Sequence, residues 1–123
     1  MSDLEIFEYE GEGYQRTMHF ENWRVAIANH TQKFDRLGCT HLERHLLTDE
    51  VFVLLKGDAV LVTGLECTET KMEIGKVYNV KQGAWHAIYM EKDAKVLIVE
   101  NHDTCRDNSE RYPLHNDTER KDV

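Results

Sequence analysis

The amino-acid sequence predicts an all-β fold, and three observations support this prediction. First, apolar and polar residues alternate with a period of two in runs such as 23–27, 76–80 and 94–99, which is the pattern of half-buried strands. Second, glycines separate these runs at short intervals, where the tight turns of hairpins belong. Third, no stretch of the sequence has the helical periodicity of a long amphipathic helix.

The alternation and the turn residues give the expected strands in order along the chain. They cover residues 5–10, 15–20, 23–29, 40–46, 50–56, 58–63, 76–80, 84–90 and 94–100. Residues 50–56 are apolar on both faces after Glu50, which indicates a strand buried on both sides. Residues 66–75 are predicted to form a polar hairpin loop. From residue 101 the chain is polar, and we expect it to lie over the domain as far as Leu114, with Tyr112 and Leu114 as anchors.

Length and charge limit the class of protein. The chain has 123 residues, which fits one domain, because single domains commonly contain roughly 100–150 residues. We assign this domain to residues 1–114 and expect residues 115–123 to form a polar, disordered tail. The formal net charge is −8, and residues 1–12 contain several carboxylates but no Lys or Arg. Nucleic-acid binding needs the opposite sign, so no nucleic-acid partner is predicted.

The sequence shows no recognisable targeting or membrane segment. No run approaches the ~20 apolar residues of a membrane-spanning helix, and the first residues lack the basic and apolar regions of a signal peptide. We therefore expect a cytoplasmic protein with no membrane partner. The three cysteines are widely spaced and form no C-x-x-C pair, which argues against a disulfide framework or a structural zinc ribbon.

A group of polar residues precedes the strand at 50–56. Alternate residues of an extended strand share a face, so four polar side chains would line one side of the strand at 40–46. They are Cys39, His41, Glu43 and His45. If this face points into a β-barrel, the convergence of imidazoles and carboxylates is what a divalent metal requires. If it points outward, the same groups are simply solvated.

Glu50 and His86 are expected to point toward the interior. Glu50 has the parity of the apolar residues that follow it, and burying a carboxylate is costly unless it is protonated, paired with a cation or bound to a metal. His86 likewise shares the parity of the apolar residues after it. The apolar residues on these two faces, which are expected to line a pocket, are Phe52, Leu54, Ile88 and Met90.

The order of these residues resembles that of the cupins, small jelly-roll barrels with two sequence motifs. The first motif reads G-x5-H-x-H-x3-4-E-x6-G, and Glu50 and Gly57 have the separation that it requires. His45 stands in the place of the second histidine, and Glu43 takes the place of the first. The opening glycine, Gly38, is shifted by one position.

The second cupin motif reads G-x5-P-x-G-x2-H-x3-N. Gly75, Gly83 and His86 match it, whereas Lys81 occupies the proline position and Met90 the asparagine position. The resemblance covers residues 38–90 closely. It implies a cupin-type jelly-roll β-barrel in a small single-domain protein, a monocupin.

The resemblance also implies a metal site and a function. By the family pattern, His45, Glu50 and His86 would bind a divalent metal (Mn, Fe or Zn), and Glu43 would be a fourth ligand or a catalytic base. His41 is a competing ligand, but it lies about 13 Å from His45 along an extended strand and can share an ion only if the chain bends. Cys39 is expected to be a small apolar filler.

The implied substrate is a small, oxygen-rich metabolite, such as a sugar derivative or a carboxylic or keto acid. The chemistry would be that of a metal-dependent isomerase, lyase or dioxygenase, and the residues do not distinguish these reactions. The missing first histidine supports an alternative, a metal-free cupin that binds or senses a small molecule without catalysis.

The outer faces of two expected strands suggest a homodimer. Both strands have an apolar outer surface, much of which a monomer would expose: opposite His86 lie Trp85, Ala87 and Tyr89, and opposite Glu50 lie Val51, Val53 and Leu55. A second copy of the chain would cover this surface, with Trp23 and Trp85 as packing anchors. Alternatively, residues 15–29 fold back over it within one subunit.

Overall fold

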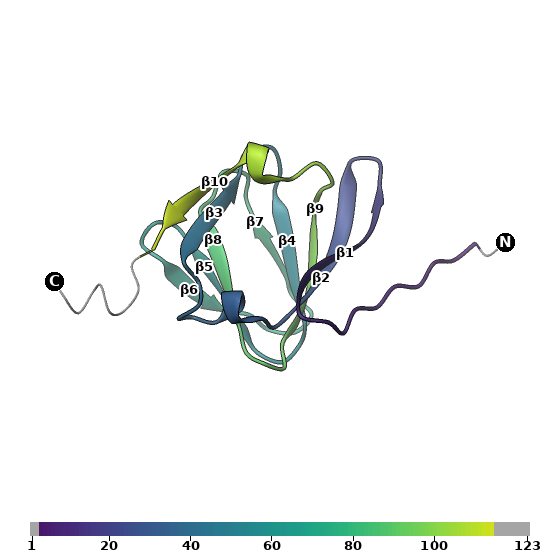
Figure 1. Cartoon of the computed structure of the whole chain (residues 1–123), viewed down its shortest axis with the longest axis horizontal. Coiled ribbons are helices and arrows are strands. Elements are labelled where there is room, and N and C mark those ends of the chain that lie inside the picture. The colour runs from purple at the N-terminus through teal and green to yellow at the C-terminus, as the bar shows by residue number, and fades with distance from the viewer. Residues whose placement is uncertain (1–2, 115–123) are drawn as a thin grey trace.

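The computed structural model describes residues 3–114, which form two antiparallel five-stranded sheets that face each other (Figure 1). In spatial order, the first sheet consists of β1 (Gly13–Phe20), β2 (Trp23–Asn29), β9 (Lys95–Asn101), β4 (Glu50–Lys56) and β7 (Val77–Val80). The second consists of β10 (Ser109–Pro113), β3 (His41–His45), β8 (His86–Met90), β5 (Ala59–Thr63) and β6 (Thr68–Lys71). The predicted all-β, jelly-roll architecture is confirmed.

Two short 3-10 helices, η1 (Gln32–Phe34) and η2 (Arg106–Asn108), connect the sheets. Among residues 3–114, no helix is long and apolar enough to cross a membrane. The predicted polar tail at 115–123 lies outside the described residues.

The period-two pattern of the sequence determines which side chains face the interior. In β4 the buried positions alternate, and Phe52 and Leu54 point inward. In the neighbouring β9, Ile98 lies directly opposite Phe52 and Val96 directly opposite Leu54, so Val96 and Ile98 also point inward. These side chains form one core with residues of the second sheet, because burying each apolar side chain favours folding by about 1.5–3 kcal/mol.

The strand predicted at residues 5–10 is wrong. Residues 3–12, which we call the N-terminal arm, extend away from the barrel and form no strand among the described residues (Figure 1). Ile6 is 83% exposed. The arm is attached to the barrel near its end, where the Asn29 side-chain amide donates to the carbonyls of Tyr9 and Gly11. Alternation predicts an extended backbone, but a strand also needs a neighbouring strand to pair with.

The prediction of a polar loop at 66–75 needs correction, and the C-terminal segment contains a strand that was not predicted. Residues Thr68–Lys71 form β6, which pairs with β5 at the edge of the second sheet although all four side chains are exposed. Residues Ser109–Pro113 form β10, which pairs with β3. Backbone hydrogen bonds at a sheet edge do not require apolar side chains, and a search for apolar alternation therefore misses such strands. The anchoring of the C-terminal segment extends to Leu114, whose N–H donates to the Thr40 carbonyl.

Gly57 shows why the first cupin-like motif ends in glycine. It follows β4 with a φ of +76°, in the left-handed region that side chains disfavour. A Cβ at this position would lie 2.8 Å from the backbone of Ala94. Glycine therefore allows the β4–β5 turn to lie against the turn that precedes β9.

Candidate metal centre

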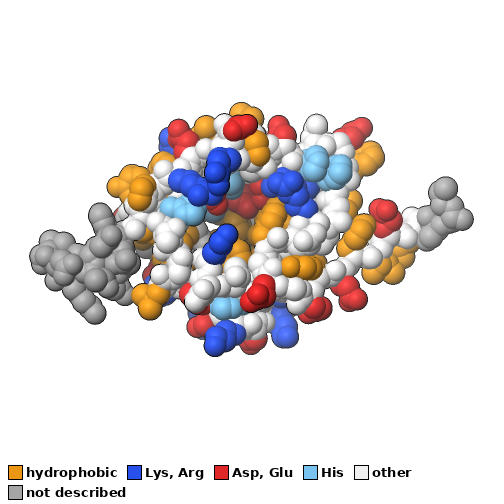
Figure 2. Space-filling model, viewed as in Figure 1, with side chains coloured by type: hydrophobic (Ala, Val, Ile, Leu, Met, Phe, Trp, Pro, Cys, Tyr) orange, Lys and Arg blue, Asp and Glu red, His pale blue; other side chains and the backbone are white. Residues whose placement is uncertain are grey.

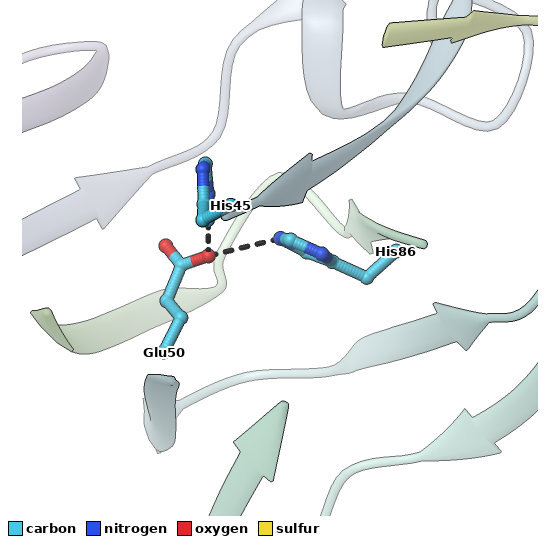
Figure 3. A group of neighbouring side chains, drawn as sticks. All are labelled: His45, Glu50 and His86. Atoms are coloured by element: carbon cyan, nitrogen blue, oxygen red, sulfur yellow. Dashed lines mark hydrogen bonds and ion pairs between the residues drawn. The ribbon is translucent and has the colours of Figure 1, made fainter. Parts of the chain in front are cut away.

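Three side chains from three strands converge inside the barrel (Figure 3). Glu50, the first residue of β4, places Oε1 3.0 Å from Nε2 of His45 and 2.9 Å from Nε2 of His86. His45 is the last residue of β3 and His86 the first of β8. One possible ligand atom from each residue lies within 4.8 Å of the others. The side chains are only 6–11% exposed.

This geometry fits a first-row divalent ion. Ligand atoms about 2.1 Å from a common ion and at right angles to each other lie about 3 Å apart, which matches both nitrogen-to-oxygen distances. Two imidazoles and one carboxylate form the donor set that non-haem ferrous iron uses with open coordination positions. The same set is acceptable to zinc and manganese.

The other ring nitrogens of both histidines are held in place. Nδ1 of His86 lies 3.0 Å from the Ala84 carbonyl, which can only accept, so this nitrogen carries a proton and Nε2 faces the centre. Nδ1 of His45 lies 2.8 Å from the hydroxyl of Ser109 on β10. Such partners orient metal-binding imidazoles.

The pKa values of the three groups are shifted by one another. Burial alone would raise the pKa of Glu50, but hydrogen bonds from His45 and His86 lower it well below its ordinary value. Burial alone would lower the pKa of each histidine, but the hydrogen bond and the charge of Glu50 raise both pKa values. Without a metal, these interactions shift the centre toward an ionised carboxylate and toward protonated imidazoles.

Glu43 lies on the wall of the cavity but outside this group. It faces His86 across the β3–β8 pair, yet its side chain is 40% exposed and its carboxylate lies 3.9 Å from Nε of Arg111. Within the described chain, only His45, Glu50 and His86 form a group close enough to share an ion. Glu43 is therefore a partly exposed carboxylate at the mouth of the cavity, outside the centre.

The two other candidates on this strand also lie away from the centre. His41 lines the cavity, with Nδ1 3.1 Å from the Thr40 hydroxyl, and burial lowers its pKa. Cys39 also lines the cavity, and burial raises the pKa of its thiol, which keeps it in the poorly nucleophilic protonated form.

A buried pair behind the centre was not expected from the sequence. Glu100 on β9 is buried, and its Oε1 accepts from the Arg24 guanidinium at 3.1 Å. Burial and the nearby charge of Glu50 raise the pKa of Glu100 to about 8. Arg24, also buried, additionally donates to the hydroxyl of Tyr14 and to the carbonyls of residues 102 and 104. Arg24 therefore fixes Glu100 beside the centre.

The centre opens into a cavity of about 690 Å³. Of the four apolar residues expected to line a pocket, Phe52 and Ile88 are among those that line this cavity. All four belong to the hydrophobic core, but Leu54 and Met90 are not among the residues that line the cavity. They share the inward parity, but they lie further along their strands, beyond the floor of the cavity.

Comparisons with solved structures agree with this architecture. A cupin-2 domain protein from Shewanella frigidimarina is 15% identical, with a TM-score of 0.58 over 76% of this chain and 85% of that chain. The chain has the cupin fold. A Streptomyces Pac13 variant with bound uridine covers 90% of this cupin barrel and 87% of its own chain, at 7% identity and a TM-score of 0.65, and Pac13 is described as a nucleoside dehydratase.

The ferrous form of HppE is also similar to this cupin barrel. It is 17% identical, with a TM-score of 0.55 over 72% of this chain and 50% of that chain. No protein-family model and no curated protein matches the sequence. At these identities the structural similarity establishes the fold, and the function has to be argued from the site itself.

Proposed function

We propose that this cupin is an enzyme that holds a divalent metal with His45, Glu50 and His86 and acts on a small, oxygen-rich metabolite. The observation that carries the proposal is the convergence of two imidazole nitrogens on one buried carboxylate at 2.9 and 3.0 Å. A ferrous ion in HppE and a bound nucleoside in a Pac13 variant, both similar barrels, support it. Iron, manganese and zinc are the metals that this donor set suits.

The residues of the chain have distinct roles in this proposal. When bound, the ion would supply Lewis acidity and open positions for an oxygen ligand. Phe52 and Ile88 provide an apolar wall that limits water near the centre. Glu43, which lines the cavity, would act as a base that takes a proton from a bound substrate, or would be an additional metal ligand. The reaction is an isomerisation, an elimination or an oxygenation.

Elemental analysis of protein purified without an affinity tag tests the metal. We expect close to one equivalent of a transition metal per chain in the wild type and a large loss in His86→Ala. His30→Ala is the matched control, because His30 pairs with Asp35 and is not among the residues that line the cavity. The absence of a stoichiometric metal in the wild type, after growth with iron, manganese and zinc, would remove this proposal.

One observation favours the alternative of a metal-free binding cupin. Glu50 already has two imidazole partners, so the buried carboxylate is neutralised without an ion. This alternative predicts that chelation leaves the thermal stability unchanged. The proposed metalloenzyme instead loses stability on chelation, because a ligand that binds only the folded state stabilises it.

A homodimer remains part of the proposal. Trp23 is 44% exposed, and the outer face of β7 carries Val77, which is 68% exposed. Trp85 packs against Tyr112 and the Arg44 guanidinium, so Trp23 is the better candidate anchor. Sedimentation of the wild type and of Trp23→Ser tests this state. A monomer in both would exclude it.

A further inference from the structure

Positive charge is concentrated around the mouth of the cavity, although the chain as a whole is acidic. The formal net charge is −8, yet the residues that line the cavity include five cations and three carboxylates. The cations are Arg16, Arg24, Lys33, Arg106 and Arg111, and the carboxylates are Glu43, Glu50 and Glu100. In Figure 2, Lys and Arg side chains surround the hollow at the middle of the molecule, and acidic side chains lie inside it.

Four of these cations form what we call the cationic rim. They are Arg16 on β1, Lys33 on η1, Arg106 on η2 and Arg111 on β10. All four are exposed, and they come from four separate elements. Arg24 does not belong to the rim, because it is buried and its guanidinium is bound to protein acceptors.

The rim cations are poorly neutralised by the protein. Among residues 3–114, no carboxylate lies within ion-pair distance of Arg16, Lys33 or Arg106, and Arg111 has only the 3.9 Å contact with Glu43. Unpaired cations gathered at one opening raise the local concentration of anions and the rate at which they associate. Arginine also matches the planar geometry of carboxylate and phosphate oxygens.

We propose that the metabolite carries an anionic group, a carboxylate or a phosphate, which the cationic rim binds at the mouth of the cavity. The uncharged, oxygen-rich part of the molecule then extends inward to His45, Glu50 and His86. This inference rests on the proposed function, because it assigns the same cavity to the substrate. The cavity of about 690 Å³ accommodates a small metabolite rather than a polymer.

Three small probes of similar size test the charge requirement. They are glycerol, glycerate and glycerol 3-phosphate, which are neutral, a carboxylate and a phosphate ester. Their binding to the purified protein is measured by calorimetry at low salt, before and after metal removal. We expect both anions to bind at least about tenfold more tightly than glycerol, since each charge-assisted hydrogen bond is worth that much or more. The anion that binds more tightly indicates whether the metabolite carries a carboxylate or a phosphate. Added salt should weaken the binding of both anions.

Substitutions of two residues of the cationic rim test whether the rim binds the anion. Lys33→Gln combined with Arg106→Gln should weaken the preferred anion at least about tenfold, with the metal content and the melting temperature unchanged. Lys92→Gln is the matched control, because Lys92 is exposed and is not among the residues that line the cavity. The inference is overturned if glycerol binds as well as the anions, if neither anion binds at millimolar concentration, or if Lys92→Gln weakens binding as much as the rim variant.

The outcomes separate this inference from the metal proposal. Elemental analysis reports the metal without using any probe. Anion binding that depends on Lys33 and Arg106 in a protein without stoichiometric metal would support the rim and refute the metalloenzyme. Stoichiometric metal in a protein that binds glycerol as well as the two anions would support the metalloenzyme and refute the rim.

Discussion

Replacing Glu50 with Gln in the metal-free protein is expected to destabilise the fold, by an amount that depends on pH. The carboxylate is 8% exposed and contacts two histidine side chains that are 11% and 6% exposed. Removing one partner from a buried charged group typically costs about 3–5 kcal/mol, because the remaining charges stay buried without compensation. For a domain of this size that corresponds to a fall in melting temperature of about 12–19 °C.

The direction of the pH dependence follows from the shifted pKa values. The pKa values of His45 and His86 are raised in the folded state. Their stabilising contribution is therefore fully present below the ordinary histidine pKa of about 6.5 and is lost as the pH rises through the raised values. The pKa of Glu50 is lowered, so its contribution is lost only in acid, below about pH 4. The penalty of Glu50→Gln should be largest near about pH 6 and much smaller near about pH 9.

Urea unfolding of both proteins after chelation, at these two pH values, measures the difference. Glu8→Gln is a control, because it removes an exposed carboxylate from the N-terminal arm and should change the free energy of unfolding by less than about 0.5 kcal/mol. An equal penalty at both pH values, or one that grows with pH, would refute the view that Glu50 stabilises two protonated imidazoles.

Three further predictions concern the same region. Metal affinity should rise as the pH increases through the raised pKa values of His45 and His86, because both imidazoles must lose a proton to bind an ion. Competition with a chelator measures this affinity. An affinity that does not depend on pH would contradict the assigned ligands. Glu43→Gln should leave the metal content unchanged and lower turnover by about 10²–10⁴-fold if Glu43 is the base, whereas a loss of metal would make it a ligand. Arg24→Met should lower the free energy of unfolding in urea by about 3–5 kcal/mol, because it leaves Glu100 buried without its partner. The control Arg16→Met changes an exposed arginine and should lower it by less than about 1 kcal/mol. Similar values for both variants would exclude the role of Arg24 in fixing Glu100.

The sequence indicated the centre because strand parity and motif spacing act together. Parity assigned Glu50 and His86 to inward faces, and the resemblance to cupin motifs connected them with His45. Parity specifies a face but not a depth along the strand. Glu43 has the parity of His45 and lies opposite His86, yet its side chain is 40% exposed and lies near Arg111 instead of in the centre. Residue spacing along one strand could not predict this difference, because it depends on which residues of the neighbouring strands lie beside each position.

The sequence contains a signal that could have predicted the Arg24–Glu100 pair. Arg24 has the inward parity of Ala26 and Ala28, and Glu100 has that of Ile98. Two opposite charges at inward positions of different strands indicate a buried pair. Their contact still required the strand pairing, because Arg24 lies directly opposite Glu100 only in the β2–β9 register, across 76 residues of sequence. Local patterns carry no information about such pairings.

His45 and His86 belong to one sheet and Glu50 to the other. An ion or ligand bound by all three side chains would therefore link the two sheets to each other at the centre. Backbone amides of both sheets should then exchange with deuterated solvent more slowly in the loaded protein, including those on strands that supply no ligand. Binding of a ligand at one small site would in this way make the strands around the mouth of the cavity more rigid.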